Sequence, residues 1–149
     1  MGHQTASGVT LGISNTAPAT HDETGFDALT FTNVGELTNV GEFGKEWALV
    51  THSPLASRGV KKSKGGYNNG TLNPALALDP DDAGQTAMKT ALESDSNAYF
   101  AVTLQDGTIF YFEGLVMSFK PNIGGNDDVV TASASIEISP SAIIEKAAA

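Results

Sequence analysis

The chain has 149 residues, no cysteine, and 8 lysines and arginines against 17 aspartates and glutamates, which gives a net charge of −9. This length predicts a single domain, and the lack of cysteine excludes disulfides, thiolate metal sites and cysteine nucleophiles. The acidic balance disfavours broad adhesion to nucleic acid, and no signal peptide or membrane span is expected, so we predict no membrane partner.

The first part of the chain predicts an extended arm. Residues 1–25 are rich in threonine, serine, alanine and glycine, and their one plausible strand is 9–13, where apolar residues alternate with small or polar ones. We interpret 1–25 as an N-terminal arm without a core of its own. The Val-Gly-Glu tripeptide then occurs at Val34 and again at Val40, but two copies are too few for a solenoid.

Two strands flank a long polar segment. Residues 46–52 form a short apolar strand whose neighbours indicate that Trp47 is buried in the core. Residues 71–78 form another strand, in which Pro74 marks an edge or a bulge. Between them, 53–70 is rich in glycine and asparagine, which is typical of a long loop or an extended hairpin.

One helix is predicted at about residues 80–93. Asp79 is suited to cap it, Pro80 fits its first position, and an apolar face follows with helical spacing. Strict alternation after residue 97 then predicts two strands joined by a hairpin at Asp106-Gly107. In the second of these strands, we expect one shared face, made of Ile109, Tyr111, Leu115, Met117 and Phe119.

A last half-buried strand runs over 130–138, and 141–149 is predicted to be a C-terminal extension that is loose or forms a short helix. Together these elements predict a mainly β protein that forms a single domain, residues 1–149. We expect a β-sandwich or partly open barrel of about six to eight strands, with one flanking α-helix, a long β-hairpin loop and an extended N-terminal arm.

The chemistry-bearing residues do not assemble into a predicted site. His3, His21 and His52 have no spacing that would place two of them on one face. Helix capping explains the acidic run 79–82, and a tight turn explains 126–128. We therefore predict no catalytic residue, no metal ligand and no cofactor, and we expect that the protein is not an enzyme.

The basic residues are strongly clustered. Four of the eight lie within seven residues, which leaves four basic against 17 acidic side chains elsewhere, a net charge of −13. They are Arg58, Lys61, Lys62 and Lys64. One interpretation is a solvated loop whose lysines maintain solubility. The other is a positive prong that docks on an acidic patch of another copy.

Four segments, taken in order, resemble tail tube proteins of long non-contractile-tailed bacteriophages, and the resemblance runs from about Val34 to Ser139. The segments are VGELTNVGEFGKEWALVTHSPLASRGVKKSKGG, DAGQTAMKTAL, LQDGTIFYFEGLVMSF and VVTASASIEIS. The resemblance implies a structural virion protein that forms hexameric rings stacked into a hollow tail tube. It also implies assembly in the host cytoplasm and final residence in the virion.

The resemblance further implies the partners and the contact residues. The partners would be other copies, the tape-measure protein inside the tube, and the tail-tip and tail-terminator proteins, with DNA only as passing cargo. The loop 53–70 would reach the adjacent ring, so that Arg58, Lys61, Lys62 and Lys64 meet acidic residues there. An acidic lumen repels phosphate, and the candidates to line it are Thr71, Asn73, Thr103 and Gln105.

The alternative is a ligand-binding β-sandwich of the carbohydrate-binding or adhesin type. Such a module is also acidic, free of cysteine and rich in threonine and glycine. It usually exposes aromatic rings that stack on sugars, whereas the chain has one tryptophan, which is expected in the core.

Overall fold

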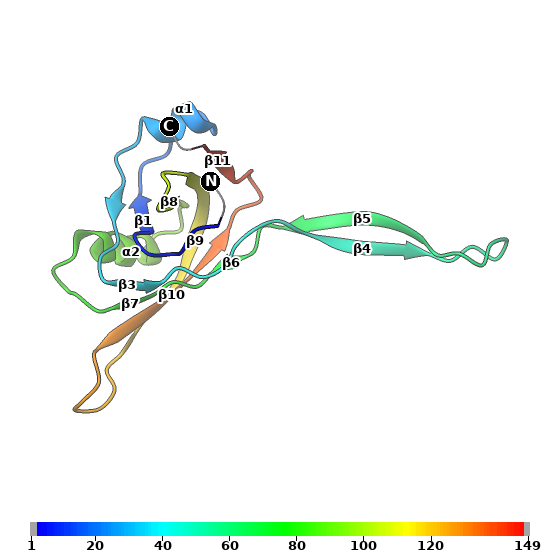
Figure 1. Cartoon of the computed structure of the whole chain (residues 1–149). Coiled ribbons are helices and arrows are strands. Elements are labelled where there is room, and N and C mark those ends of the chain that lie inside the picture. The colour runs from blue at the N-terminus through cyan, green and yellow to red at the C-terminus, as the bar shows by residue number, and fades with distance from the viewer. Residues whose placement is uncertain (1–2, 148–149) are drawn as a thin grey trace.

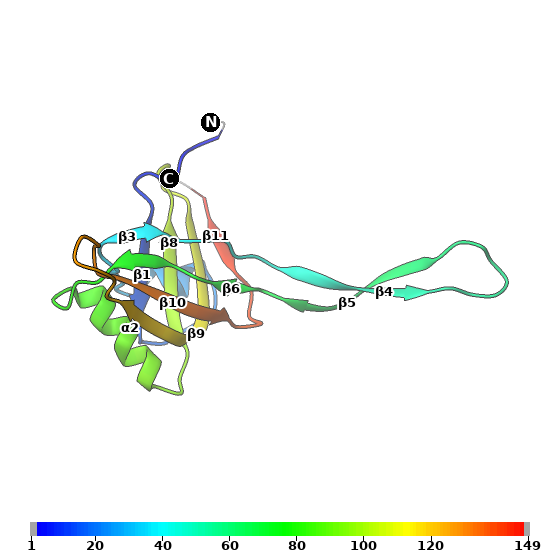
Figure 2. The same ribbon diagram turned by 90° about the horizontal axis from the view of Figure 1, so that it is seen from below.

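The computed structural model describes residues 3–147 as a curled antiparallel sheet with two helices and one hairpin that stands far out from it (Figures 1 and 2). The sheet order is β2-β1-β8-β9-β10-β7-β3, with β11 also paired to β9 and β6 to β10. Its strands are β1 (Thr10–Ser14), β2 (Thr32–Asn33), β3 (Leu37–Asn39), β6 (Thr71–Leu72), β7 (Ala75–Ala77), β8 (Ala98–Thr103), β9 (Ile109–Asn122), β10 (Thr131–Ile138) and β11 (Ile144–Lys146). The prediction of a mainly β, partly open barrel is confirmed.

The predicted flanking helix is present as α2 (Ala83–Glu93), which packs against β9, β1 and β2. Its N-cap is Asp82 and not Asp79, so the predicted start is one turn too early. The Asp82 carboxylate accepts hydrogen bonds from the backbone N–H groups of Gln85 and Gly35, both at 2.9 Å. This second bond ties the cap to a distant loop, and Asp79 instead accepts a bond from the N–H of Asp81 in the preceding turn.

The core lies on both faces of the sheet. The larger cluster fills the concave side beneath α2 and includes the buried Leu11, Phe100 and Phe112. On the other face, the second helix, α1 (Glu23–Asp27), inserts Phe26 against Ala101 and Tyr111. The sequence predicted only one helix, because α1 has just five residues.

The interpretation of 1–25 as an arm without a core is wrong for residues 10–14. The expected strand exists as β1, but it lies inside the sheet between β2 and β8, with Leu11 and Ile13 buried in the main core. Two apolar side chains on one face of a five-residue strand are enough to fix it there once β8 supplies the partner backbone.

The alternation along β9 is interrupted by a bulge. Ser118 pairs with Ser135 and Val116 with Ile136, so Met117 has no partner in β10. The bulge therefore moves Phe119 to the other face, where it joins the main core, whereas Ile109, Tyr111, Leu115 and Met117 share one face as predicted. On that face Tyr111 is buried against Phe26, and Leu115 and Met117 are exposed.

The C-terminal extension is also more ordered than predicted. Residues Ile144–Lys146 form β11, which pairs with Tyr111, Phe110 and Ile109 of β9. The 14-residue β9 is longer than β10, so its first residues would otherwise present an open edge on that side. β11 covers this edge.

Candidate assembly surfaces

The projecting hairpin consists of β4 (Glu46–His52) and β5 (Lys61–Asn68), which pair only with each other. All seven residues of β4 are exposed, and the ribbon runs straight away from the body in both views (Figures 1 and 2). For 53–70 the sequence was compatible with either a long loop or an extended hairpin. The structure shows the hairpin, in which this segment forms the tip and strand β5. A two-stranded ribbon with nothing packed on it buries little apolar surface, so it needs a partner to be stabilised.

Trp47 lies on this hairpin, and the prediction that it is buried in the core is wrong. Its side chain is 41% exposed and packs against the cross-strand Tyr67, with 5.1 Å between ring centroids. The ammonium of Lys64 lies 5.2 Å from the Trp47 ring, and that of Lys45 lies 4.4 Å from the Tyr67 ring. The apolar neighbours of Trp47 resemble a core strand, but no second sheet covers them.

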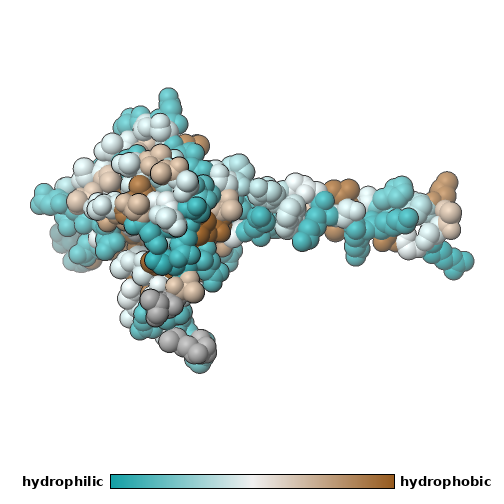
Figure 3. Space-filling view, turned by 90° about the horizontal axis from the view of Figure 1, so that it is seen from above, coloured by the Kyte–Doolittle hydropathy of each residue, from teal (hydrophilic) through white to brown (hydrophobic). Residues whose placement is uncertain are grey.

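The structure places the four predicted contact residues together on this hairpin. Lys61, Lys62 and Lys64 lie on β5 and Arg58 in the tip, and all four are exposed. Among the described residues, the one salt bridge joins Lys146 to Asp27, so the hairpin cations form none. The tip also exposes two apolar side chains, Leu55 and Val60, and apolar atoms are visible at its far end in Figure 3.

The root of the hairpin is anchored to the segment between β10 and β11. The Tyr67 hydroxyl donates to the carbonyl of Pro140 at 2.9 Å. The buried Asn69 donates from its side-chain amide to the carbonyls of Ser139 and Ser141, at 2.7 and 2.9 Å. These bonds fix the direction in which the ribbon leaves the body.

The predicted lumen residues fall in two places. Thr71, on β6, donates its hydroxyl to Glu137 of β10 at 2.7 Å, and Asn73 lies exposed just beyond it. Thr103 ends β8, and Gln105 lies in the turn that follows. By register, Thr71 and Thr103 share the face opposite the main core, but β9 and the smaller cluster separate them.

That same face carries an uncovered area on β9 and β10, polar apart from Leu115 and Met117, that sequence reasoning did not select. It consists of Leu115, Met117, Ser118, Lys120, Ser133, Ser135 and Glu137. The alternation of threonine, serine and glutamate in 131–137 was a usable signal, because it marked one side of β10 as solvent-facing.

Two electrostatic clusters on the body are structural. Asp27 accepts from the Tyr111 hydroxyl at 2.6 Å and from Lys146 at 3.0 Å, and these two contacts lower the pKa of Asp27. Burial, with the contact to Asp27, raises the pKa of Tyr111. Burial acts to raise the pKa of Glu113, but hydrogen bonds led by that of Ser141 hold it below its usual value. Both clusters fasten α1 and the C-terminal segment to the sheet.

The three histidines stay apart. His3 and His52 are exposed, and His21 packs edge-on against Phe26 with its Nε2 atom 2.7 Å from the Ala142 carbonyl. Within residues 3–147, no three histidine, aspartate or glutamate side chains gather as metal ligands. In the same part of the chain, no helix is long and apolar enough to span a membrane.

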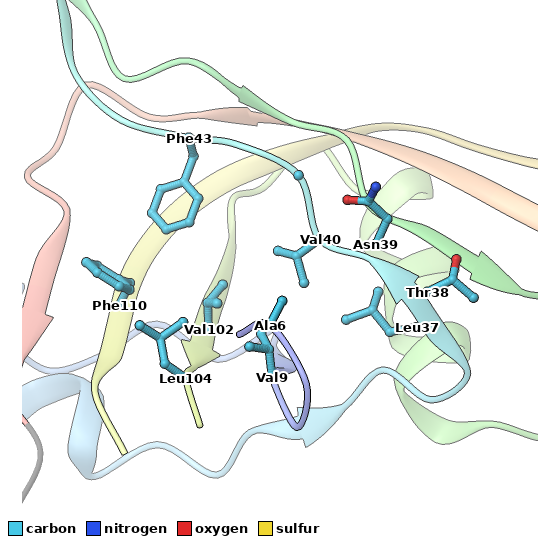
Figure 4. Close-up of a pocket in the computed structure, with 11 residues that line it drawn as sticks. Ala6, Val9, Leu37, Thr38, Asn39, Val40, Phe43, Val102, Leu104 and Phe110 are labelled. Carbon is cyan, nitrogen blue, oxygen red and sulfur yellow. The ribbon is translucent and has the colours of Figure 1, made fainter. Parts of the chain in front are cut away.

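An apolar groove of about 410 Å³ opens at one end of the half-barrel (Figure 4). Its walls come from the N-terminal segment, from β3 and the residues after it, and from the β8–β9 hairpin. The apolar side chains that line it are Ala6, Val9, Leu37, Val40, Phe43, Val102, Leu104 and Phe110. Sequence analysis missed the groove, because it forms only where three distant segments meet.

Comparisons with known proteins identify the fold. Neither the family models nor the curated proteins contain a match to this chain. Among solved structures, the chain is similar to one from the 6-fold symmetrised baseplate of the anti-feeding prophage, with a TM-score of 0.72 and 9% identity over 99% of both chains. It is similar to one from the C6-symmetric tail of the empty gene transfer agent particle, with a TM-score of 0.68 and 14% identity over 97% of this chain and 100% of that one.

The chain is also similar to the SPP1 tail tube protein, with a TM-score of 0.63 and 14% identity over 87% of this chain and 72% of that one. At these identities the likeness establishes the fold. The resemblance to tail tube proteins drawn from the sequence motifs is thus confirmed at the level of the fold.

Proposed function

We propose that this protein is the subunit of a tail tube, in which hexameric rings stack into a hollow tube. The observation that carries the proposal is the hairpin β4–β5: an exposed, basic ribbon attached to an acidic body that has the tail tube fold. The C6 symmetry of the gene transfer agent tail, which contains a similar chain, supports hexameric rings.

The stacking contact follows from the hairpin. Its cations have no salt-bridge partner among the described residues, and the body carries the compensating acidic charge. Arg58, Lys61, Lys62 and Lys64 therefore contact acidic residues of a subunit in the adjacent ring. Because this contact joins two different surfaces, it repeats from ring to ring and does not close on itself.

The proposed lumen is lined by polar side chains of an acidic body. Thr71, Asn73, Thr103 and Gln105 remain the candidates from the sequence, and the polar side of β10 around Glu137 adjoins the first two. A net negative wall repels DNA phosphates, so DNA passes during ejection without specific binding.

The proposed partners are the other copies, the tape-measure protein within the tube, and the tail-tip and tail-terminator proteins at its ends. The protein assembles in the host cytoplasm and ends in the virion tail of a long non-contractile type. Its role is structural, with no catalytic activity and no cofactor.

The test is negative-stain electron microscopy and light scattering of the purified protein at high concentration. The triple variant Lys61→Glu, Lys62→Glu, Lys64→Glu should keep the circular dichroism spectrum of the body and lose tube elongation. The matched control replaces the same lysines with arginine, which keeps the charge and should keep the tubes. Tubes of normal length from the glutamate variant would contradict the stacking role.

The exposure of Trp47 and Tyr67 favours a second candidate, a carbohydrate-binding or adhesin-type module. The ammonium groups of Lys64 and Lys45 already lie over the Trp47 and Tyr67 rings, respectively. The Tyr67 hydroxyl already donates a hydrogen bond to the Pro140 carbonyl at the root of the hairpin. Because Trp47 is the single tryptophan, its fluorescence reports directly on ligands at this site. Saturable quenching of the monomer by an oligosaccharide would support the binding module over the tube.

A further inference from the structure

The groove at the end of the half-barrel is apolar on both walls (Figure 4). Leu37, Val40 and Phe43 face Leu104 and Phe110 across it. These side chains are only partly buried, although they pack against the main core. A concave apolar site of about 410 Å³ falls within the size range of ligand-binding pockets, so it is large enough to receive an aliphatic side chain.

The residues next to the groove carry more acidic than basic charge, with three carboxylates against one lysine, Lys45, which lies two residues after the wall residue Phe43. Glu36 precedes the wall residue Leu37, and Glu42 precedes Phe43; both glutamates are exposed. Asp106 lies two residues after Leu104 on the opposite side. None of the lining residues is a lysine or an arginine, so an occupant with an apolar end and flanking positive charge would be complementary.

The tip of hairpin β4–β5 has that chemistry. Leu55 is fully exposed at the end of the ribbon, and Val60 is about half exposed. Arg58 lies between them in the sequence, and the lysines of β5 follow. The tip cannot reach the groove of its own subunit, because the ribbon extends away from the body (Figure 2).

We infer that the groove receives the hairpin tip of a second copy, with Leu55 as the apolar anchor and Arg58 near the acidic rim. The inference rests on the proposed function and names the surface on the neighbouring ring that the hairpin contacts. An interface can be organised around an aliphatic anchor that fills a pocket within a polar rim, where burial of the apolar group supplies affinity and the rim charges supply orientation.

The absence of cysteine makes this contact testable by cross-linking. We would combine Leu55→Cys at the tip with Asn39→Cys at the exposed rim of the groove and oxidise tubes mildly. The expected product is a ladder of disulfide-linked dimers, trimers and longer chains, since each subunit offers one tip and one groove. The control pair, Leu55→Cys with Asn126→Cys in the β9–β10 turn, should stay monomeric on a denaturing gel.

The outcomes separate the two proposals. Wild-type tubes with no ladder from the Leu55–Asn39 pair, or a ladder from the control pair instead, would overturn the groove as the receptor and leave the tube intact. If the wild-type protein forms no rings or tubes and shows saturable sugar binding, the proposed function fails, and this inference fails with it.

A second measurement does not depend on cysteine geometry. Loss of one buried leucine anchor weakens a contact by roughly tenfold to a hundredfold. Leu55→Asp should therefore raise the protein concentration needed for tubes at least by that factor, whereas Leu55→Met should change it little. Equal thresholds for Leu55→Asp and the wild type would contradict the inference.

Discussion

Replacing Gln85 with alanine should cost about 3–5 kcal/mol of unfolding free energy, the largest loss we expect from any single polar side chain. Gln85 is fully buried near the start of α2. Its Nε2 donates to the carbonyls of Gly35 and Ala77, at 3.1 and 3.0 Å, and its Oε1 accepts from the N–H of Asp79 at 3.0 Å. One amide thus joins α2 to the β2–β3 connection and to the end of β7.

The magnitude follows from the groups left behind. Alanine at this position removes the partner of two carbonyls and one N–H, all on partly buried backbone. Each unsatisfied group costs about 1–3 kcal/mol when water cannot replace the lost bond and less when it can. Three such groups give about 3–5 kcal/mol, which is a third or more of the stability of an ordinary domain.

The assay is urea unfolding of the monomer at low concentration, followed by far-UV circular dichroism. The matched control is Thr90→Ala on the exposed side of the same helix, where one hydroxyl bond to the Thr86 carbonyl is lost. That variant should lie within about 0.5 kcal/mol of the wild type. A loss below about 1 kcal/mol for Gln85→Ala would refute the view that this amide holds the three segments together.

Three further predictions concern the hairpin, the helix contact and acid stability. Trp47→Ala should leave the unfolding free energy of the body within about 0.5 kcal/mol, because the ring lies outside the core; a larger loss in urea melts would show that the hairpin supports the body. Gly84→Ala should destabilise by about 1–3 kcal/mol despite the better helix propensity of alanine, because a Cβ there collides with the backbone of Asn33; a higher melting temperature would contradict this close packing. Asp27→Asn should be less stable than the wild type at pH 7, since a depressed folded-state pKa contributes stability above the unfolded value that is lost as pH falls. In parallel urea melts the difference in unfolding free energy should shrink as the pH falls below about 4, and a constant difference would exclude the Asp27 charge, held by Tyr111 and Lys146, as its source.

Local patterns predicted the regular parts of the fold. Alternation in 130–138 identified β10, and Asp106-Gly107 identified the β8–β9 hairpin. Helical spacing found α2, although its cap moved to Asp82 because that carboxylate also binds the N–H of Gly35, 47 residues away. Such a bond is a tertiary contact, and no local rule contains it.

What the sequence missed depends on pairing between distant segments. β11 has three residues, and only the free edge of β9 makes it a strand. Trp47 sits among apolar residues, as core tryptophans do, but whether a second sheet covers a strand is decided by topology. For the candidate site, the sequence identified the basic cluster by charge alone, whereas the groove required three chain segments to meet.

Under the proposed function, the separation of charge and apolar surface accounts for how separate subunits avoid one another and how a tip finds its groove. The ribbon exposes its apolar tip at the far end of a strongly cationic stretch, so two tips repel each other. The acidic bodies likewise repel one another, which leaves the tip of one copy and the groove of another as the attractive pairing. The attraction between the cationic ribbon of one copy and the acidic body of another steers their approach and weakens as salt is added. Burial of Leu55 in the groove would slow dissociation. Because the proposed pairing joins unlike surfaces, every ring added to the proposed tube would present fresh tips or grooves, and growth would continue until another protein covers them.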